Sequence, residues 1–276
     1  MLKLMFLGTS SGAGKSFVCA LACRHFSKKG MDAVPFKASN LSLLSHRTED
    51  GGEIGVGQAL QAVASGKKPE GRMNPILLRP SGKGSIDVRV LGSSVYRISP
   101  GCKPGAESLI GHALESFDAL ASRHDLVVCE GSGSPVELNL MDNDVANLRM
   151  ARERGIPCVI VADIERGGAF AAVYGTWLLT PEKDRGLLKG FLINRFRGDP
   201  SILWDGIGKI ETMTGMECLG IIPYVDVDLP AEDSPGGGGA FRMPDSGKYL
   251  KALDAVLDAC GDSVDFARME GIASGN

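Results

Sequence analysis

Gly8-Thr9-Ser10-Ser11-Gly12-Ala13-Gly14-Lys15-Ser16 is the stretch that decides the fold. It follows an apolar run at 2–7 and opens a helical pattern, which is the strand–loop–helix context of a phosphate-binding loop. Its glycines let successive N–H groups turn onto an anion, and the positive end of the following helix points at the same place. We expect phosphate contacts from Gly12, Ala13, Gly14, Lys15 and Ser16, with Ser16 also holding Mg²⁺. A glycine-rich turn that binds nothing is the alternative.

Apolar runs of strand length alternate with amphipathic runs of helix length along most of the chain. The pattern predicts strands at 2–7, 32–37, 125–129, 157–162, 189–194 and 218–222. It predicts helices at 15–29, 53–65, 105–122, 143–154, 168–179 and 201–213. Such alternation predicts an α/β fold with a mainly parallel, doubly wound sheet, as in P-loop NTPases. The segments 74–79 and 85–91 predict an added hairpin or edge pair.

Composition shifts near the C-terminus suggest the domain organisation. We expect the main domain to cover 1–234 and a glycine-rich linker to cover 235–248, which includes four consecutive glycines at 236–239. The remaining 249–276 form a helical tail, in which 249–269 has the pattern of a single amphipathic helix.

Bulk properties argue against several classes of partner. The net charge of the 276-residue chain is −3 and no basic run stands out, so we expect no nucleic-acid partner. No apolar stretch approaches the roughly 20 residues that a membrane helix needs, and the first apolar run leads straight into the glycine loop. We therefore expect a cytoplasmic protein with no membrane partner. The seven cysteines form no CxxC pair, which favours reduced core thiols over disulfides or a metal centre.

Polar side chains follow four of the predicted strands, namely Lys37, Glu130, Asp163 and Asn194. In an open parallel sheet, ligands bind beyond the carboxyl ends of the strands. A carboxylate at Glu130 suits Mg²⁺, with a turn or helix cap as the alternative. Lys37 is placed to stabilise a transferring phosphoryl group, unless it is simply a solvated lysine. Asn194 offers a donor and an acceptor, which suits the edge of adenine.

Two further segments carry polar groups whose role the residues alone leave open. Asp50, just before Gly51 and Gly52, could complete a magnesium shell or cap the following helix. The stretch 137–147 gathers more carboxylates and amides than a helix cap needs, which predicts contacts with a polar ligand.

Taken in order, these motifs resemble the synthetase domain of the cobyric acid synthase family, the glutamine-dependent corrinoid amidases of the dethiobiotin synthetase-like P-loop group. The resemblance covers roughly residues 1–234. Besides the phosphate loop, it is carried by Pro35-Phe36-Lys37-Ala38, Asp50-Gly51-Gly52-Glu53-Ile54-Gly55, Gln58-Ala59-Leu60-Gln61-Ala62, Met73-Asn74-Pro75, Glu130-Gly131-Ser132-Gly133-Ser134-Pro135, Asp144-Val145-Ala146-Asn147, Ala162-Asp163-Ile164-Glu165-Arg166-Gly167-Gly168 and Asn194-Arg195-Phe196-Arg197-Gly198-Asp199, with Leu229-Pro230-Ala231-Glu232-Asp233-Ser234 at the family's domain end.

The resemblance implies a reaction in cobalamin biosynthesis with ATP and Mg²⁺ as cofactors. ATP phosphorylates a carboxylate of a corrinoid, cobyrinic acid a,c-diamide, and ammonia converts the acyl phosphate into an amide. The roles it implies are catalysis for Lys15, Lys37 and Asp144; Mg²⁺ binding for Ser16, Asp50 and Glu130; adenine recognition for Asn194; and substrate contacts for Ser134, Asn147 and Asp163.

The chain also departs from the family pattern. The family usually continues into a glutaminase domain with a nucleophilic cysteine, and no such domain fits the residues after the glycine-rich stretch. We therefore expect ammonia from solution or from a separate glutaminase subunit, and relatives often form homodimers. Substrate-side motifs match less well than nucleotide-side motifs. The alternatives are a P-loop ATPase switch or subunit that gates a partner, and a ligase for a different carboxylate.

Overall fold

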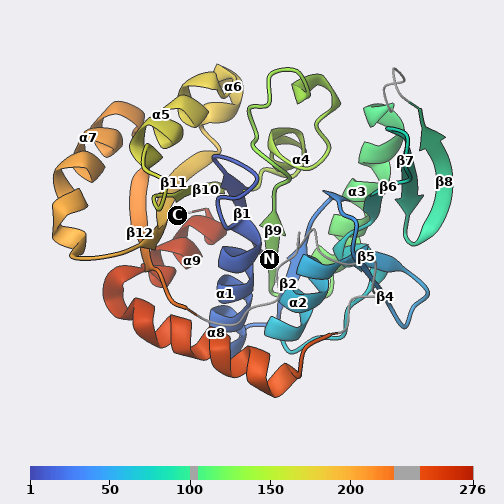
Figure 1. Ribbon diagram of the computed structural model, residues 1–276, viewed down its shortest axis with the longest axis horizontal. Coiled ribbons are helices and arrows are strands. Elements are labelled where there is room, and N and C mark those ends of the chain that lie inside the picture. The colour runs from blue at the N-terminus through green and yellow to red at the C-terminus, as the bar shows by residue number, and fades with distance from the viewer. Residues whose placement is uncertain (100–104, 227–242, 276) are drawn as a thin grey trace.

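A computed structural model describes residues 1–99, 105–226 and 243–275 (Figure 1). Its centre is a six-stranded sheet in the order β12-β11-β10-β1-β9-β2, and every neighbouring pair is parallel. The strands are β1 (Leu2–Gly8), β2 (Ala33–Phe36), β9 (Leu126–Glu130), β10 (Cys158–Asp163), β11 (Leu188–Phe196) and β12 (Glu217–Pro223). The predicted α/β class with a doubly wound parallel sheet is confirmed.

Helices cover both faces of this sheet (Figure 1). One face carries α1 (Lys15–Lys28), α2 (Val56–Ala64), α8 (Ser246–Cys260) and α9 (Phe266–Ser274). The other carries α3 (Ala106–Ala121), α4 (Leu148–Arg154), α5 (Ala169–Leu179) and α7 (Trp204–Thr214), with the short α6 (Glu182–Arg185) between the last two in sequence. Because side chains alternate along a strand, Leu4 and Phe6 of β1 pack into the first core, and Met5 and Leu7 into the second.

A smaller sheet stands beside the β2 edge of the main one (Figure 1). It has the order β3-β6-β7-β8, formed by β3 (Ser39–Leu41), β6 (Ile76–Pro80), β7 (Ile86–Val90) and β8 (Ser93–Ile98). The antiparallel β6–β7 pair confirms the predicted hairpin, whereas β3 and β8 were not predicted. The hairpin of β4 (Ser45–Arg47) and β5 (Glu53–Gly55) precedes α2.

Three predicted helices differ from those observed. The helix expected at 53–65 begins only at Val56, because 53–55 pair with β4. The helix expected at 143–154 begins at Leu148, after a short 3-10 turn, η2 (Met141–Asn143), and a tight turn. The single helix expected over 249–269 is wrong, since α8 ends at Cys260. The chain turns through η4 (Gly261–Ser263), and Asp265 then caps α9 by accepting from the N–H of Arg268.

Two other 3-10 turns are η1 (Gly71–Met73), which precedes β6, and η3 (Pro200–Leu203), which leads into α7. Most of the predicted linker, 235–242, lies outside the described residues. Among the residues that the structure does describe, none of the helices combines the length and apolar character needed to cross a membrane.

Candidate nucleotide and acid site

The loop between β1 and α1 is packed closely at Gly8 and Gly14, two of its three glycines. Gly14 has φ 93°, and a Cβ there would come within 2.1 Å of the Asn194 amide nitrogen. A Cβ at Gly8 would lie 2.8 Å from Lys15 Nζ. A left-handed backbone and this close approach exclude a side chain at Gly14. At Gly12, by contrast, the space around a Cβ would be open.

Lys15 is only 4% exposed and lies over this loop. Its ammonium group donates to the carbonyl of Ser10 at 3.1 Å and to that of Gly133 at 2.8 Å. The second contact depends on Asn147, whose amide accepts from the N–H of Ser132 and donates to its carbonyl, both at 2.9 Å. The turn after β9 therefore helps to hold the lysine of the phosphate loop.

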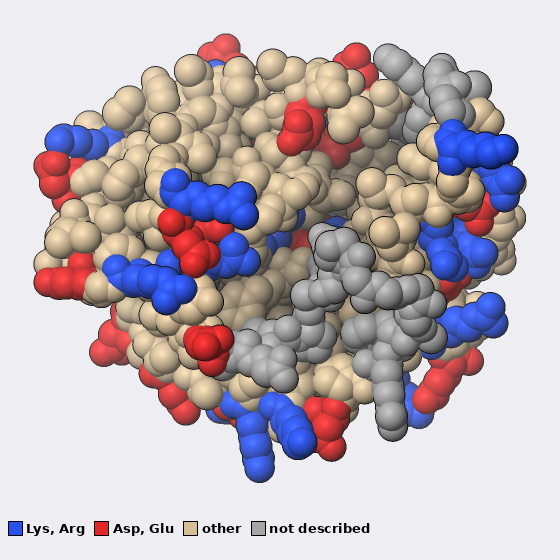
Figure 2. Space-filling view, viewed as in Figure 1, with Lys and Arg blue, Asp and Glu red and all other residues tan. Residues whose placement is uncertain are grey.

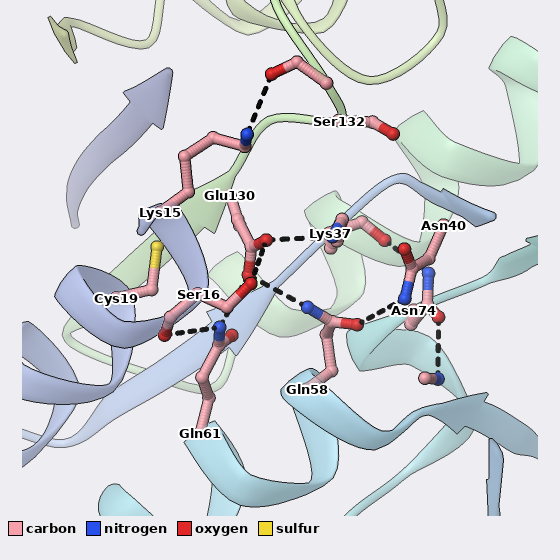
Figure 3. Close-up of polar contacts among 12 residues, drawn as sticks. Lys15, Ser16, Cys19, Lys37, Asn40, Gln58, Gln61, Asn74, Glu130 and Ser132 are labelled. Atoms are coloured by element: carbon pink, nitrogen blue, oxygen red, sulfur yellow. Dashed lines mark hydrogen bonds and ion pairs between the residues drawn. The ribbon is translucent and has the colours of Figure 1, made fainter. Parts of the chain in front are cut away.

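Glu130, at the end of β9, is the centre of a buried polar cluster (Figure 3). One carboxylate oxygen accepts from the ammonium of Lys37 at 2.8 Å and from the hydroxyl of Ser16 at 2.7 Å. The other accepts from the amides of Gln58 at 3.0 Å and Gln61 at 2.6 Å. The structure thus brings together Ser16, Lys37 and Glu130, which the sequence had marked separately.

Opposing effects act on the carboxyl of Glu130. Burial alone would raise its pKa, because a charge is less stable away from water. The nearby ammonium of Lys37 and the hydrogen bonds from Lys37, Gln61 and Ser16 outweigh burial and hold the pKa below its usual value. A carboxylate kept ionised beside a serine hydroxyl provides the oxygen ligands that a hard cation such as Mg²⁺ prefers.

Four amide side chains with no role predicted from the sequence also belong to this cluster. Gln58 and Gln61 lie three residues apart on α2 and present both their amides to Glu130. Gln58 also accepts from Asn40 at 3.2 Å. Asn74 is fully buried and donates to the carbonyl of Lys37 at 2.8 Å. One feature of the sequence indicates such a role: the buried face of α2, otherwise apolar, carries two glutamines.

Asn194 lies against the other side of the phosphate loop. Its amide donates to the carbonyl of Ala13 at 3.0 Å and accepts from the N–H of Arg195 at 3.0 Å. The Arg195 guanidinium contacts the carbonyl of Gly12 at 3.3 Å and Asp163 at 2.7 Å. Asp163 pairs with this arginine and accepts from the N–H of Glu165, and its expected substrate contact stays a prediction.

Asp50 lies outside the Glu130 cluster, and its expected magnesium role stays a prediction. Its carboxylate accepts from the N–H groups of Gly52 and Gly71 and from the Thr48 hydroxyl, so it closes the β4–β5 turn and ties that turn to η1. The pKa of Asp50 stays below its usual value because these hydrogen bonds outweigh the opposing effect of burial.

Asp144 also has a local role. One carboxylate oxygen accepts from the N–H groups of Ala146 at 3.0 Å and Asn147 at 2.8 Å, and the other from that of Arg149 at 3.1 Å. These are amides of the turn and first turn of α4, which lack intrahelical partners. Asp144 therefore caps α4; it also lines the cleft described below, and its catalytic role stays a prediction.

A cleft of about 860 Å³ opens between the phosphate loop and the smaller sheet. Its polar floor includes Lys15, Ser16, Lys37 and Glu130, and Ser134 lines it nearby. Neither Asn194 nor Asp163 lines it. The cleft and Asn194 thus lie on different sides of the phosphate loop.

A parallel sheet, a glycine loop that follows its central strand β1, and a buried lysine over that loop define a P-loop nucleotide-binding domain. The chain belongs to the family described as the CobQ/CobB/MinD/ParA nucleotide binding domain, whose CbiA profile matches residues 4–235.

Curated relatives named cobyric acid synthase are similar to the chain. The probable cobyric acid synthase of Methanoculleus marisnigri is 46% identical over 84% of this chain and 48% of its own length. The cobyric acid synthase of Streptococcus sanguinis is 40% identical over 97% of this chain and 54% of its own. The chain therefore spans about half the length of the curated relatives it matches.

Among solved structures, the MinC:MinD cell division protein complex of Aquifex aeolicus contains a chain of the same fold. The two align with a TM-score of 0.51 at 14% identity, over 100% of this chain and 97% of that one. At this identity the likeness concerns the fold alone.

Proposed function

We propose that this domain binds ATP with Mg²⁺ and uses it to activate a corrinoid carboxylate for amidation in cobalamin biosynthesis. The observation that carries the proposal is the Ser16–Glu130–Lys37 cluster at the junction of the phosphate loop and the cleft. The name shared by curated relatives at 40–46% identity supports the choice of acid.

The residues present fit the nucleotide and its metal. The loop is tight, with a left-handed backbone at Gly14, as in loops that turn N–H groups onto phosphate oxygens, and Lys15 lies beside it. Ser16 and Glu130 supply oxygen ligands for Mg²⁺, which would neutralise charge on the terminal phosphates. Nδ2 of Asn194 has two protons, of which one is donated to Ala13; the other would serve the edge of adenine.

The proposed chemistry has two steps. A carboxylate oxygen of the acid attacks the γ-phosphorus of ATP. The bond between that phosphorus and the oxygen that bridges to the β-phosphorus breaks. ADP departs, and the acid is now an acyl phosphate. Ammonia then attacks the acyl carbon, the carbon–oxygen bond to phosphate breaks, and nitrogen loses a proton as the amide forms. Lys37 and Lys15 would stabilise the negative charge on the transferring group, because both are buried where charge interactions are strong. Ammonia would come from solution or from a separate glutaminase.

Phosphate release tests the proposal directly. We expect release from ATP to require Mg²⁺, a corrinoid acid and ammonium together, with glutamine active only beside a glutaminase. Lys15→Ala should lower the rate about 100-fold or more with the thermal unfolding midpoint retained. Release that ignores every corrinoid acid and ammonium would contradict the proposal.

A further inference from the structure

The wall of the cleft opposite the phosphate loop is apolar, and the alternation of the smaller sheet explains why. Ile86 and Ile98 are cross-strand partners, and Leu78 lies two positions along on β6. All three line the cleft. The intervening partners Arg79, Asp87 and Arg97 point to the opposite face, because neighbouring side chains on a strand alternate.

Charged side chains on that outer face form ion pairs. Arg79 and Arg89 both pair with Glu53, at 2.8 and 2.5 Å, and Arg89 also pairs with Asp87 at 3.2 Å. In Figure 2, Lys and Arg side chains gather at the right-hand margin, where Figure 1 places this sheet. The inner face therefore presents hydrocarbon to the cleft rather than charge.

A second wall, of mixed character, comes from the loop that precedes α4, where Glu137, Asn139 and Asp144 also line the cleft. Leu140 and Met141 line the same cleft, although Leu140 is 57% exposed. On the first wall, Leu41 of β3 also lines the cleft and is 52% exposed. Large apolar side chains left open to water around a cleft with a charged floor are typical of a ligand-binding site.

We propose that these two walls bind the apolar ring of a large cyclic acid, with a side-arm carboxylate reaching the floor at Lys15 and Lys37. This inference rests on the proposed function and identifies which residues select the acid. A volume of about 860 Å³ is far more than a small dicarboxylic acid would fill. Adenine does not need this space, since Asn194 lies outside it. Leu41, Leu78, Ile86, Leu140 and Met141 would determine specificity for the ring.

The chain offers matched controls for the test. Leu43 and Leu138 are exposed to 68% and 66%, lie two residues from Leu41 and Leu140, and do not line the cleft. Binding of cobyrinic acid a,c-diamide is measured by equilibrium dialysis with Mg²⁺ and ADP. Leu41→Ser and Leu140→Ser should each weaken binding about fivefold or more, because apolar contact area is lost. Leu43→Ser and Leu138→Ser should match the unsubstituted chain, and ADP affinity should stay unchanged in all four variants.

Equal corrinoid affinity in all four variants would overturn the inference, as would a small dicarboxylic acid that binds as tightly as the corrinoid. Either result leaves the proposed amidation intact if phosphate release still requires an acid and ammonium. Conversely, corrinoid binding that weakens only in the two cleft variants, without ammonium-dependent release, supports the ring site and contradicts the amidation. The ring site and the proposed amidation can therefore be contradicted independently of each other.

Discussion

At the scale of single residues, the phosphate loop and the Glu130 cluster are tightly packed. Gly14 approaches Asn194 so closely that no side chain can enter, and Glu130 accepts hydrogen bonds at both of its oxygens. Neither feature relies on long, flexible surface side chains. Single substitutions here should therefore have large and specific effects.

Gly14→Ala should distort the loop. The methyl group would meet the Asn194 amide, and alanine would be strained at φ 93°. We expect a loss of about 1–3 kcal/mol in the free energy of unfolding, measured by urea denaturation, and weaker binding of a fluorescent nucleotide. Gly12→Ala should change the free energy of unfolding little, because its Cβ has open space. Equal destabilisation by both substitutions would show that the crowding at Gly14 does not matter.

Gln61→Leu should weaken the binding of Mg²⁺ with nucleotide by about 10-fold or more, since it removes a donor that orients Glu130. Stability should also fall, because the donor bonds to Glu130 and to the Ser16 carbonyl are lost; removal of Gln61 Oε1, which has no hydrogen-bond partner among the described residues, offsets part of that loss. A titration of nucleotide binding with Mg²⁺ measures the effect. Ser65→Ala, at the end of the same helix, serves as the control. A Mg²⁺ dependence identical in the two variants would contradict the orienting role.

At the scale of elements, the ends of strands and the starts of helices position most of the side chains of the candidate site. β9 delivers Glu130, β2 is followed directly by Lys37, and α1 starts at Lys15. Helix α4 contributes indirectly, because Asn147, just before it, holds the turn whose Gly133 carbonyl accepts from Lys15. The start of α4 is in turn held by Asp144.

Asp144→Ala should therefore act first on stability. Three N–H groups at the start of α4 would lose their acceptor, which typically costs about 1–2 kcal/mol at a helix N-terminus. Thermal unfolding measures this loss, and Asp142→Ala in the neighbouring exposed turn is the control. If Asp144→Ala leaves stability unchanged but stops phosphate release, the cap assignment is wrong and the predicted catalytic role is supported.

At the scale of the whole molecule, the two described ends of the chain meet on one face of the main sheet. Helices α8 and α9 pack with α1, and His25 of α1 stacks on Phe266 of α9 at 4.0 Å between ring centroids. Arg24 and Lys28 of α1 both pair with Asp254 of α8. The C-terminal helices therefore belong to the same core as the phosphate loop's helix.

Asp254→Asn should lower the free energy of unfolding by about 0.5–1 kcal/mol at neutral pH, because a bidentate pair with Arg24 is lost at the surface. The hydrogen bond and charge of Arg24 keep the pKa of Asp254 below its ordinary value. The contribution is thus fully present above the unfolded-state pKa of about 3.9, and disappears as the pH falls through the lower folded-state pKa.

Urea denaturation from pH 7 down to pH 2.5 measures this difference. Asp258→Asn, at an exposed position on the same helix, provides the control for loss of a negative charge. A stability gap between Asp254→Asn and the unsubstituted chain that persists at pH 2.5 would rule out the ion pair as its cause.

Local patterns alone predicted the phosphate loop, the parallel sheet and the positions of Lys37, Glu130 and Asn194, because strand and helix periodicity and glycine requirements act between near neighbours in sequence. Only the folded structure showed that Gln58 and Gln61 hold Glu130, that Asp50 ties the β4–β5 turn to η1, and that Asp144 caps α4. Those outcomes depend on which side chains meet: Gln61 and Glu130 are 69 positions apart in the chain, and they meet because α2 packs on α1 and on β2, the strand beside β9. The apolar cleft likewise exists only once the smaller sheet stands opposite the loop.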